Sequence, residues 1–251
     1  MKKIILNSRI IIFSLIFIFS LSSIAVAGNL SDFEDSIIEK NKRVKKTTKK
    51  SKNKSGSNMD SDDITAAILY GLAVGGIATM ERVREGERKD GDALIPFARI
   101  DLSVQDVASD VVAFDARAEF GYGAFGAQVR RTTFNEENTK DVLDLLQSHI
   151  LYRISPVEQF EVDLGLGTVT LNGGEVHSGV SFTMPVMVRF HEYLGFEYRP
   201  AWASINGNHI EDYDYALIIG SRFASLRAGY RIVQSWNNSL EGPYLGLALH
   251  F

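Results

Sequence analysis

The chain ends in "GPYLGLALHF", residues 242–251, where large apolar side chains alternate with small or polar ones. Successive side chains of a β-strand point to opposite faces, so this alternation puts the large apolar residues on one face. The segment is therefore predicted to be a β-strand with one apolar and one mixed face. The apolar face carries Leu245, Leu247, Leu249 and Phe251.

The same alternation occurs in ten successive stretches between residue 91 and the last residue. In each stretch one parity is apolar, and the other holds Gly, Ser, Thr and most of the charge. The pattern predicts an all-β domain over residues 91–251, an antiparallel up-and-down barrel of about 10 strands, with 8 and 12 as alternatives. The stretches cover residues 94–102, 112–120, 125–129, 146–154, 160–166, 180–190, 194–202, 213–223, 226–232 and 245–251.

The architecture depends on which parity faces the interior. A soluble barrel buries its apolar parity, whereas a transmembrane barrel turns that parity to lipid and the polar one into its lumen. The polar parity here carries Arg and carboxylates but no Lys, although a solvated surface is normally rich in Lys and Glu. Buried charges need partners, and a guanidinium can bind several acceptors, so a transmembrane barrel with a charged lumen is predicted. The predicted network comprises Arg99, Asp101, Asp115, Arg117, Glu119, Arg130, Arg153, Glu161, Asp163, Arg189, Glu197, Arg199, Arg222, Arg227 and Arg231.

Turn lengths and aromatic residues support the transmembrane alternative. Long connections, such as "TTFNEENTK" at 132–140 and "SINGNHIED" at 204–212, are expected to alternate with short ones such as "GYG" at 121–123. Outer-membrane barrels have short periplasmic turns and longer external loops, and an even number of strands puts both termini in the periplasm. Aromatic residues on the apolar parity are predicted to form two interfacial girdles. The periplasmic girdle comprises Phe120, Tyr122, Phe125, Phe160, Phe190, Phe223 and Phe251, and the outer one Trp202, Tyr213, Tyr215 and Trp236.

The N-terminus has the features of a secretory signal peptide over residues 1–27. A basic start is followed by a long apolar run that ends in Ala25-Val26-Ala27, which predicts cleavage between Ala27 and Gly28. An uncleaved inner-membrane anchor is the alternative, because the run is long enough to span a bilayer. The sequence has no Cys, so neither disulfides nor a lipid-modified Cys is expected.

Two further segments precede the barrel domain. Residues 28–62 are rich in Lys and poor in large apolar residues, which predicts a disordered tether; binding to anionic lipid or a cell-wall polymer is the functional alternative. Residues 63–90 combine an apolar run with a charged tail, which predicts a short helix packed at the barrel mouth or against the membrane surface.

The end of the chain also resembles a known signal. Tyr244, Gly246, Leu249 and the final Phe251 are similar to the C-terminal sorting signal of Gram-negative outer-membrane β-barrel proteins. In that class the barrel-assembly machinery reads this strand, and periplasmic chaperones escort the unfolded chain. The resemblance implies a protein of the cell outer membrane that contacts lipid and lipopolysaccharide, with its N-terminal tether in the periplasm. It says little about activity, because this ending is shared by porins, adhesins and enzymes.

Three functions are compatible with such a barrel. About 10 strands enclose a narrow lumen that charged side chains would largely fill, so we expect an occluded barrel of structural or interaction type, monomeric and without affinity for nucleic acid. A small, porin-like channel for polar solutes is the alternative, in which rearranged ion pairs open a path. An enzyme acting on lipid A or peptides is the third, for which His residues beside Ser or acids are the candidates.

None of these candidates forms a recognisable catalytic motif. Ser148 and His149 are neighbours on a strand, so they point to opposite faces and cannot act as a nucleophile and its base. His177 and His209 are expected in adjacent external loops, but no known motif links them. We therefore predict no catalytic residues, no metal ligands and no cofactor.

Overall fold

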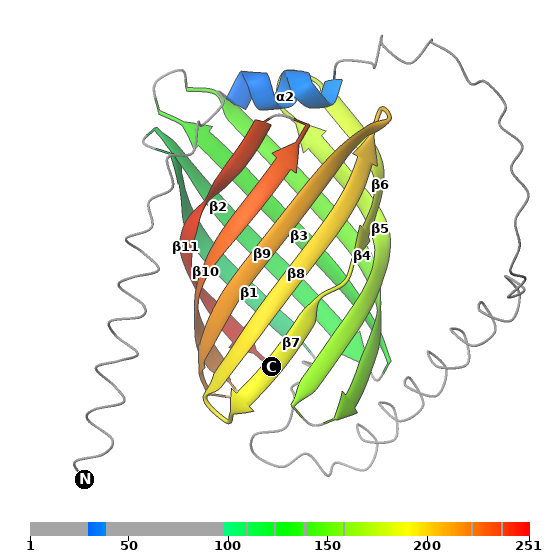
Figure 1. Cartoon of the computed structure of the whole chain (residues 1–251), viewed down its shortest axis with the longest axis vertical. Coiled ribbons are helices and arrows are strands. Elements are labelled where there is room, and N and C mark those ends of the chain that lie inside the picture. The colour runs from blue at the N-terminus through cyan, green and yellow to red at the C-terminus, as the bar shows by residue number, and fades with distance from the viewer. Residues whose placement is uncertain are drawn as a thin grey trace, which may run out of the picture.

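The computed structural model describes residues 30–38, 98–108, 110–122, 124–137, 140–157, 159–221, 223–236 and 238–251. These ranges fold almost wholly into β-strands, with one short helix. Figure 1 shows the strands wrapped into a barrel and the helix lying across one mouth. The elements are α2 (Leu30–Ile38), β1 (Ala98–Ala108), β2 (Val111–Tyr122), β3 (Phe125–Glu136), β4 (Val142–Val157), β5 (Phe160–Asn172), β6 (Val176–Thr183), β7 (Val186–His191), β8 (Leu194–Ile205), β9 (Asn208–Gly220), β10 (Ala224–Ser235) and β11 (Asn238–His250).

The sheet closes on itself. The first strand, β1, pairs with the last, β11, from Arg99 opposite His250 to Gln105 opposite Tyr244. All other pairings, including β4 with β5, are likewise antiparallel. The predicted antiparallel up-and-down barrel is therefore confirmed.

Strands β6 and β7 form one interrupted stave of this barrel. Both pair with β5 on one side and with β8 on the other. The interruption falls at Met184 and Pro185, because proline has no N–H to donate to a sheet. The Pro185 carbonyl still accepts from the Asp163 N–H at 2.8 Å. The eleven strands of the described chain thus make ten staves, the number that the alternation predicts.

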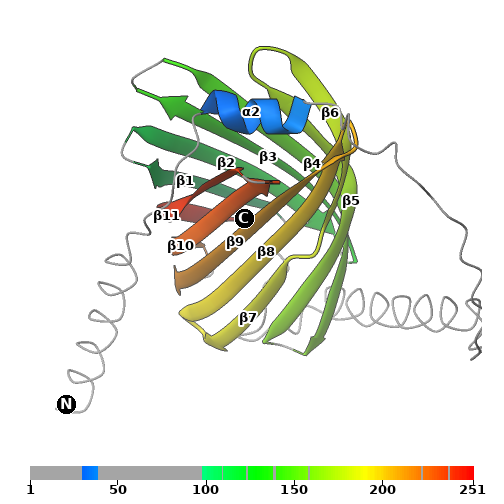
Figure 2. The same ribbon diagram turned by 45° about the horizontal axis from the view of Figure 1, so that its top comes forward.

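The two ends of the barrel differ in what they carry. The terminal rim holds Ala98, Phe251 and the turns β2–β3, β4–β5, β7–β8 and β9–β10. The Ala98 N–H donates to the Phe251 carbonyl at 3.1 Å, and the Phe251 N–H donates back at 2.9 Å, so the chain end is part of the sheet. The helix rim, at the opposite end, holds the remaining turns and α2 (Figures 1 and 2).

The prediction of long loops at one rim is wrong. Strands extend into the predicted loops, and β8 and β9 are joined by Asn206 and Gly207 alone. Both residues have positive φ, 54° and 84°, as a two-residue type I′ hairpin turn requires. Asn-Gly is the strongest short hairpin signal, and within "SINGNHIED" it shortens the connection.

Helix α2 falls inside the range predicted to be a disordered tether. Residues Leu30–Ile38 of that range are helical, and they lie at the rim opposite Phe251. The predicted signal peptide at 1–27, the rest of the tether and the predicted helix at 63–90 lie outside the described residues. No helix in the described part of the chain is long and apolar enough to cross a membrane.

Candidate functional site

The barrel interior is divided into two zones along its axis. The ion-pair zone, nearer the terminal rim, is built from buried Arg and carboxylate side chains, each at most 6 % exposed. All of the predicted network residues except Arg222 lie in it; position 222 is outside the described residues. Asp212 and Asp214 belong to it as well. The zone comprises Arg99, Asp101, Asp115, Arg117, Glu119, Arg130, Arg153, Glu161, Asp163, Arg189, Glu197, Arg199, Asp212, Asp214, Arg227 and Arg231.

Glu197 on β8 is the centre of this zone. Its Oε1 accepts from Arg99 Nη1 at 2.8 Å and from Arg199 Nε at 2.6 Å. Its other oxygen, Oε2, accepts from Arg227 Nη2 at 2.8 Å. One carboxylate on β8 thus joins Arg residues of β1, β8 and β10 across the barrel, and each guanidinium uses its several donors to reach further acids.

Asp214 on β9 links this centre to a second cluster. It accepts from Arg130 Nη2 at 3.0 Å and from the Tyr244 hydroxyl, and lies 3.4 Å from Arg227 Nη2. Tyr244 is opposite Gly229 in the β10–β11 pair. A Cβ atom at Gly229 would lie 2.6 Å from the Tyr244 ring, so only glycine leaves room for this tyrosine inside the barrel.

The second cluster extends towards the helix rim. Arg231 donates to both oxygens of Asp212, from Nε at 2.9 Å and from Nη2 at 2.7 Å. Its Nη1 lies 3.1 Å from Asp115, which also accepts from Arg130 Nε at 2.7 Å. Every charge in this cluster therefore has an opposite charge in contact, as buried ions require.

The ion pairs cross the lumen between strands that are not neighbours in the sheet. Arg153 of β4 forms an ion pair with Glu119 of β2. Its guanidinium occupies the space that a side chain at Gly121 would need. A cavity between Arg99, Glu161 and Glu197 measures only about 10 Å³. That is room for about one water molecule. The ion-pair side chains are therefore closely packed around this cavity.

The apolar zone, nearer the helix rim, is a hydrophobic core shared between the barrel and α2. Leu30, Phe33 and Ile37 of α2 follow the spacing of one helix face and are nearly fully buried. They form one buried cluster with inward-facing residues of nine strands. The zone comprises these three residues and Val107, Val111, Ala113, Phe134, Leu143, Leu145, Val169, Leu171, Ala203, Ile205, Ile210, Val233 and Leu240.

Polar contacts hold α2 at the rim. Asn208 Nδ2 donates to the Ile37 carbonyl at 2.6 Å, near the end of the helix, where carbonyls lack helical partners. At the start of the helix the Leu30 N–H donates to Glu136 Oε2 at 3.3 Å. Glu34 Oε1 accepts from the Gly174 N–H at 2.8 Å. These barrel residues lie at three different hairpins, so α2 is fastened across the mouth.

The outer wall has the reverse arrangement of the interior. Beside the ion-pair zone it is apolar, as at Ile150 and Leu166, which are 71 % and 70 % exposed. Beside the apolar zone it carries polar residues such as Thr170, Ser204 and Gln234. We call the apolar part of the outer wall the belt.

Aromatic residues lie along the edge of the belt at the terminal rim. Six of the residues predicted for the periplasmic girdle are exposed there: Phe120, Tyr122, Phe125, Phe190, Phe223 and Phe251.

The aromatic residues predicted for the outer girdle do not form a complete ring. Trp202 stacks on Phe182 with ring centroids 5.8 Å apart, and Tyr213 packs edge-on against Trp202 at 6.3 Å. Tyr198 and Tyr215 stack at 4.8 Å. These residues all come from β6, β8 and β9, so they cover one side of the barrel. Trp236 lies in the β10–β11 turn.

The candidate catalytic histidines are held in other contacts. His149 points inward and lies 2.9 Å from Ser181, while Ser148 is on the opposite face. The other ring nitrogen of His149 has no hydrogen-bond partner among the described residues, so no acid orients it as in a catalytic triad. His177 contacts Asn206 at 3.2 Å. No group of three or more His, Asp or Glu in the described ranges is placed to hold a metal ion.

The residues that resemble a sorting signal are split between the two faces of β11. Tyr244 points inward to Asp214, and Gly246 packs close to Ser103 of β1. Leu249 and Phe251 point outward, and Phe251 is 70 % exposed. The predicted cleavage site at Ala27 and Gly28 lies outside the described residues.

The parity change that separates the two zones is readable in the sequence. In "FEVDLGLGTVTLN", residues 160–172, the apolar parity shifts by one residue between Leu166 and Val169. The apolar face of α2 is also visible in the sequence, as Leu30, Phe33 and Ile37.

No protein-family model matches the chain, and no curated protein matches it in sequence.

Proposed function

We propose that the protein is an integral outer-membrane β-barrel of structural or interaction type, with an occluded polar lumen. The observation that carries the proposal is the coincidence of the belt with the ion-pair zone along the same strands. On β4 the outward residues from Leu146 to Ile154 are mostly apolar, and 9–11 tilted residues are about what a strand needs to cross a bilayer.

Exposure of the belt to water would be energetically unfavourable. The belt exposes large apolar side chains from every stave, including Leu102, Val180 and Leu226, each more than half exposed. Monomeric soluble proteins rarely expose continuous apolar patches above a few hundred Å². Lipid removes this penalty, since it is as apolar as the side chains.

Membrane integration has a direct test. In fractionated cells the protein should remain with the outer membrane after a carbonate or high-salt wash. Purified in detergent, it should migrate differently on gels before and after boiling, because a closed barrel resists unfolding. Recovery as a soluble periplasmic protein would overturn the proposal.

The occluded lumen and the channel alternative predict different conductance. The wild-type protein in a planar bilayer should give a flat trace, because the ion-pair zone is packed. A variant without residues 30–38 should also be silent, since removing α2 leaves the ion-pair zone in place. Discrete channel openings from a heat-modifiable, correctly folded sample would favour the polar-solute channel instead.

The orientation is a separate part of the proposal. With the terminal rim in the periplasm, where the assembly machinery would read Phe251, the helix rim and α2 face outward. This placement separates α2 from the periplasmic location expected for the tether. Ile38, where α2 ends, lies at the helix rim and Ala98 at the terminal rim, so these two residues are on opposite sides of a membrane-embedded barrel.

Single cysteines can decide the orientation, because the chain has none of its own. In intact cells Asn206→Cys, at the helix rim, should react with a membrane-impermeant maleimide. Glu192→Cys, at the terminal rim, should react only after the outer membrane is permeabilised. The opposite pattern would reverse the orientation and put α2 in the periplasm, while leaving the membrane barrel itself intact.

A further inference from the structure

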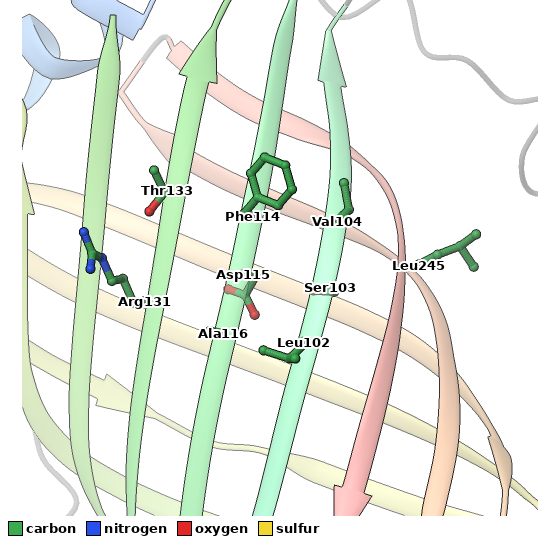
Figure 3. Close-up of a pocket in the computed structure, with 9 residues that line it drawn as sticks. All are labelled: Leu102, Ser103, Val104, Phe114, Asp115, Ala116, Arg131, Thr133 and Leu245. Carbon is green, nitrogen blue, oxygen red and sulfur yellow. The ribbon is translucent and has the colours of Figure 1, made fainter.

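A groove runs over the outer wall of β11, β1, β2 and β3 (Figure 3). Its volume is about 530 Å³. The small side chain of Ala116 forms the floor, because its neighbours are larger: Leu102 of β1 is directly opposite, and Phe114 is two residues away on β2. Leu245 of β11 borders the far side. The exposed residues of the groove from these three strands are apolar, so the site suits a hydrocarbon chain.

The fourth strand gives the groove a polar edge. Arg131 and Thr133 of β3 line it, and both contact Asp144 of β4. Arg131 donates to Asp144 from Nη2 at 2.8 Å and from Nε at 3.4 Å, and the Thr133 hydroxyl donates to the same carboxylate at 2.5 Å. The Arg131 side chain is nevertheless 63 % exposed.

This polar group is unusual for its position. Arg131 is directly opposite Ala116, and Val129, two residues nearer the terminal rim, belongs to the belt. Ionisable residues on a lipid-facing wall are expensive, and where they occur they commonly have a functional role. Among the described strands, Arg131 is the one cationic residue on the outer wall.

We propose that the groove binds one anionic phospholipid, with its phosphate on Arg131 and an acyl chain over Ala116. The inference rests on the proposed membrane location. Arg131 lies at the height where the outward residues of β3 change from Val129 to Thr133, so a bound phosphate would be at the edge of the hydrocarbon layer.

The guanidinium keeps donors available for this role. Arginine has five N–H donors, and Asp144 engages only the edge formed by Nε and Nη2. The Nη1 edge has no hydrogen-bond partner within the described ranges. Two parallel N–H donors match two phosphate oxygens, as in bidentate phosphate recognition. Asp144 lies on β4, beyond β3 from the groove, so it acts as a positioning residue that fixes the guanidinium at the β3 edge of the groove (Figure 3).

Native mass spectrometry of the purified full-length protein can test the site. Protein in detergent is titrated with phosphatidylglycerol or with diacylglycerol that has the same chains. We expect one phosphatidylglycerol to be retained per barrel and diacylglycerol to bind far more weakly. Arg131→Gln should weaken retention roughly tenfold, as the loss of a charge-assisted contact implies. Ala116→Leu, which fills the floor, should weaken retention of the same lipid.

A matched control is Ala228→Leu, an outward-facing alanine of β10 that does not line the groove. It should retain the lipid like the wild type. Equal retention in all variants would overturn the proposal, because the lipid would then be annular only. A dimer that depends on Ala116 and Arg131, seen by light scattering, would also overturn it.

Failure of this inference can be separated from failure of the proposed function. Each sample is first checked for heat-modifiable migration and for insertion into lipid vesicles. A barrel that passes both checks but retains no lipid contradicts the groove alone. A chain that fails both contradicts the membrane location on which the groove depends.

Discussion

Strand β5 turns apolar side chains outward between Phe160 and Leu166 but inward at Val169 and Leu171. The inward positions of the first half hold Glu161 and Asp163, whereas the outward positions of the second half hold threonines. The backbone and its pairing with β4 continue through the change. One sheet thus has two opposite arrangements of side chains, each suited to a different surrounding.

The difference shows what the surroundings demand of each half. Where the proposed surrounding is lipid, polar groups can be satisfied only inside, so the interior becomes a network of ion pairs. Where the proposed surrounding is water, the apolar residues point inward and form a core with α2. The two halves should therefore respond in opposite ways to the same kind of substitution.

The largest effect is expected inside the ion-pair zone. Glu197→Ala leaves Arg99, Arg199 and Arg227 without a shared acceptor, and breaking a buried ion pair in this way costs about 3–5 kcal/mol. Unfolding by urea in lipid vesicles would measure the loss. The control Asp144→Ala removes an exposed pair on the outer wall and should shift the unfolding midpoint little. Equal shifts would mean that the buried network contributes no more to the free energy of unfolding than an exposed ion pair does.

The second largest effect is expected from a cation introduced into the belt half of β5, in contrast to the same change in its other half. Leu166→Arg puts a cation into the belt and should lower the free energy of unfolding in vesicles by about 2–4 kcal/mol if the belt lies in lipid. Thr170→Arg, four residues further along the same wall, should be nearly neutral because water surrounds it. Similar effects at both positions would remove the distinction between the halves and argue against a bilayer at the belt.

A smaller effect is expected for the packing of α2. Phe33→Ala removes a buried ring from the apolar zone, and burial of such a side chain contributes about 1.5–3 kcal/mol. Hydrogen exchange in the α2 peptide should accelerate, while exchange in the ion-pair zone should not change. Asp35→Ala, on the exposed face of the helix, is the control. Exchange that accelerates throughout the barrel would instead show that the two zones unfold together.

The smallest effect concerns one hydrogen bond of α2. Asn208→Ala removes the donor to the Ile37 carbonyl, a loss of about 1 kcal/mol. The same exchange measurement should show faster opening of α2 than in the wild type but slower opening than in Phe33→Ala. If Asn208→Ala had the larger effect of the two, polar contacts rather than apolar packing would hold the helix at the rim.

Much of the fold was predictable because it depends on local alternation. The barrel, its ten staves and its antiparallel order follow from the period-two pattern and the turns. The loop lengths were not predicted, since the Asn-Gly turn at Asn206 and Gly207 was read as part of a long loop. A single apolar parity does not predict the apolar zone, because the apolar residues change to the other parity after Leu166.

The positions of the strands, and the presence of Arg and carboxylates together on one parity, follow from the amino-acid sequence alone. Side-chain direction in a strand alternates regardless of what lies across the barrel. Which charges meet depends on how the barrel closes, because partners such as Arg99 and Glu197 lie 98 residues apart in the chain. The tertiary structure alone also placed α2 in the mouth: a short amphipathic helix is stabilised by the core that it joins, and that core exists only once the barrel has closed.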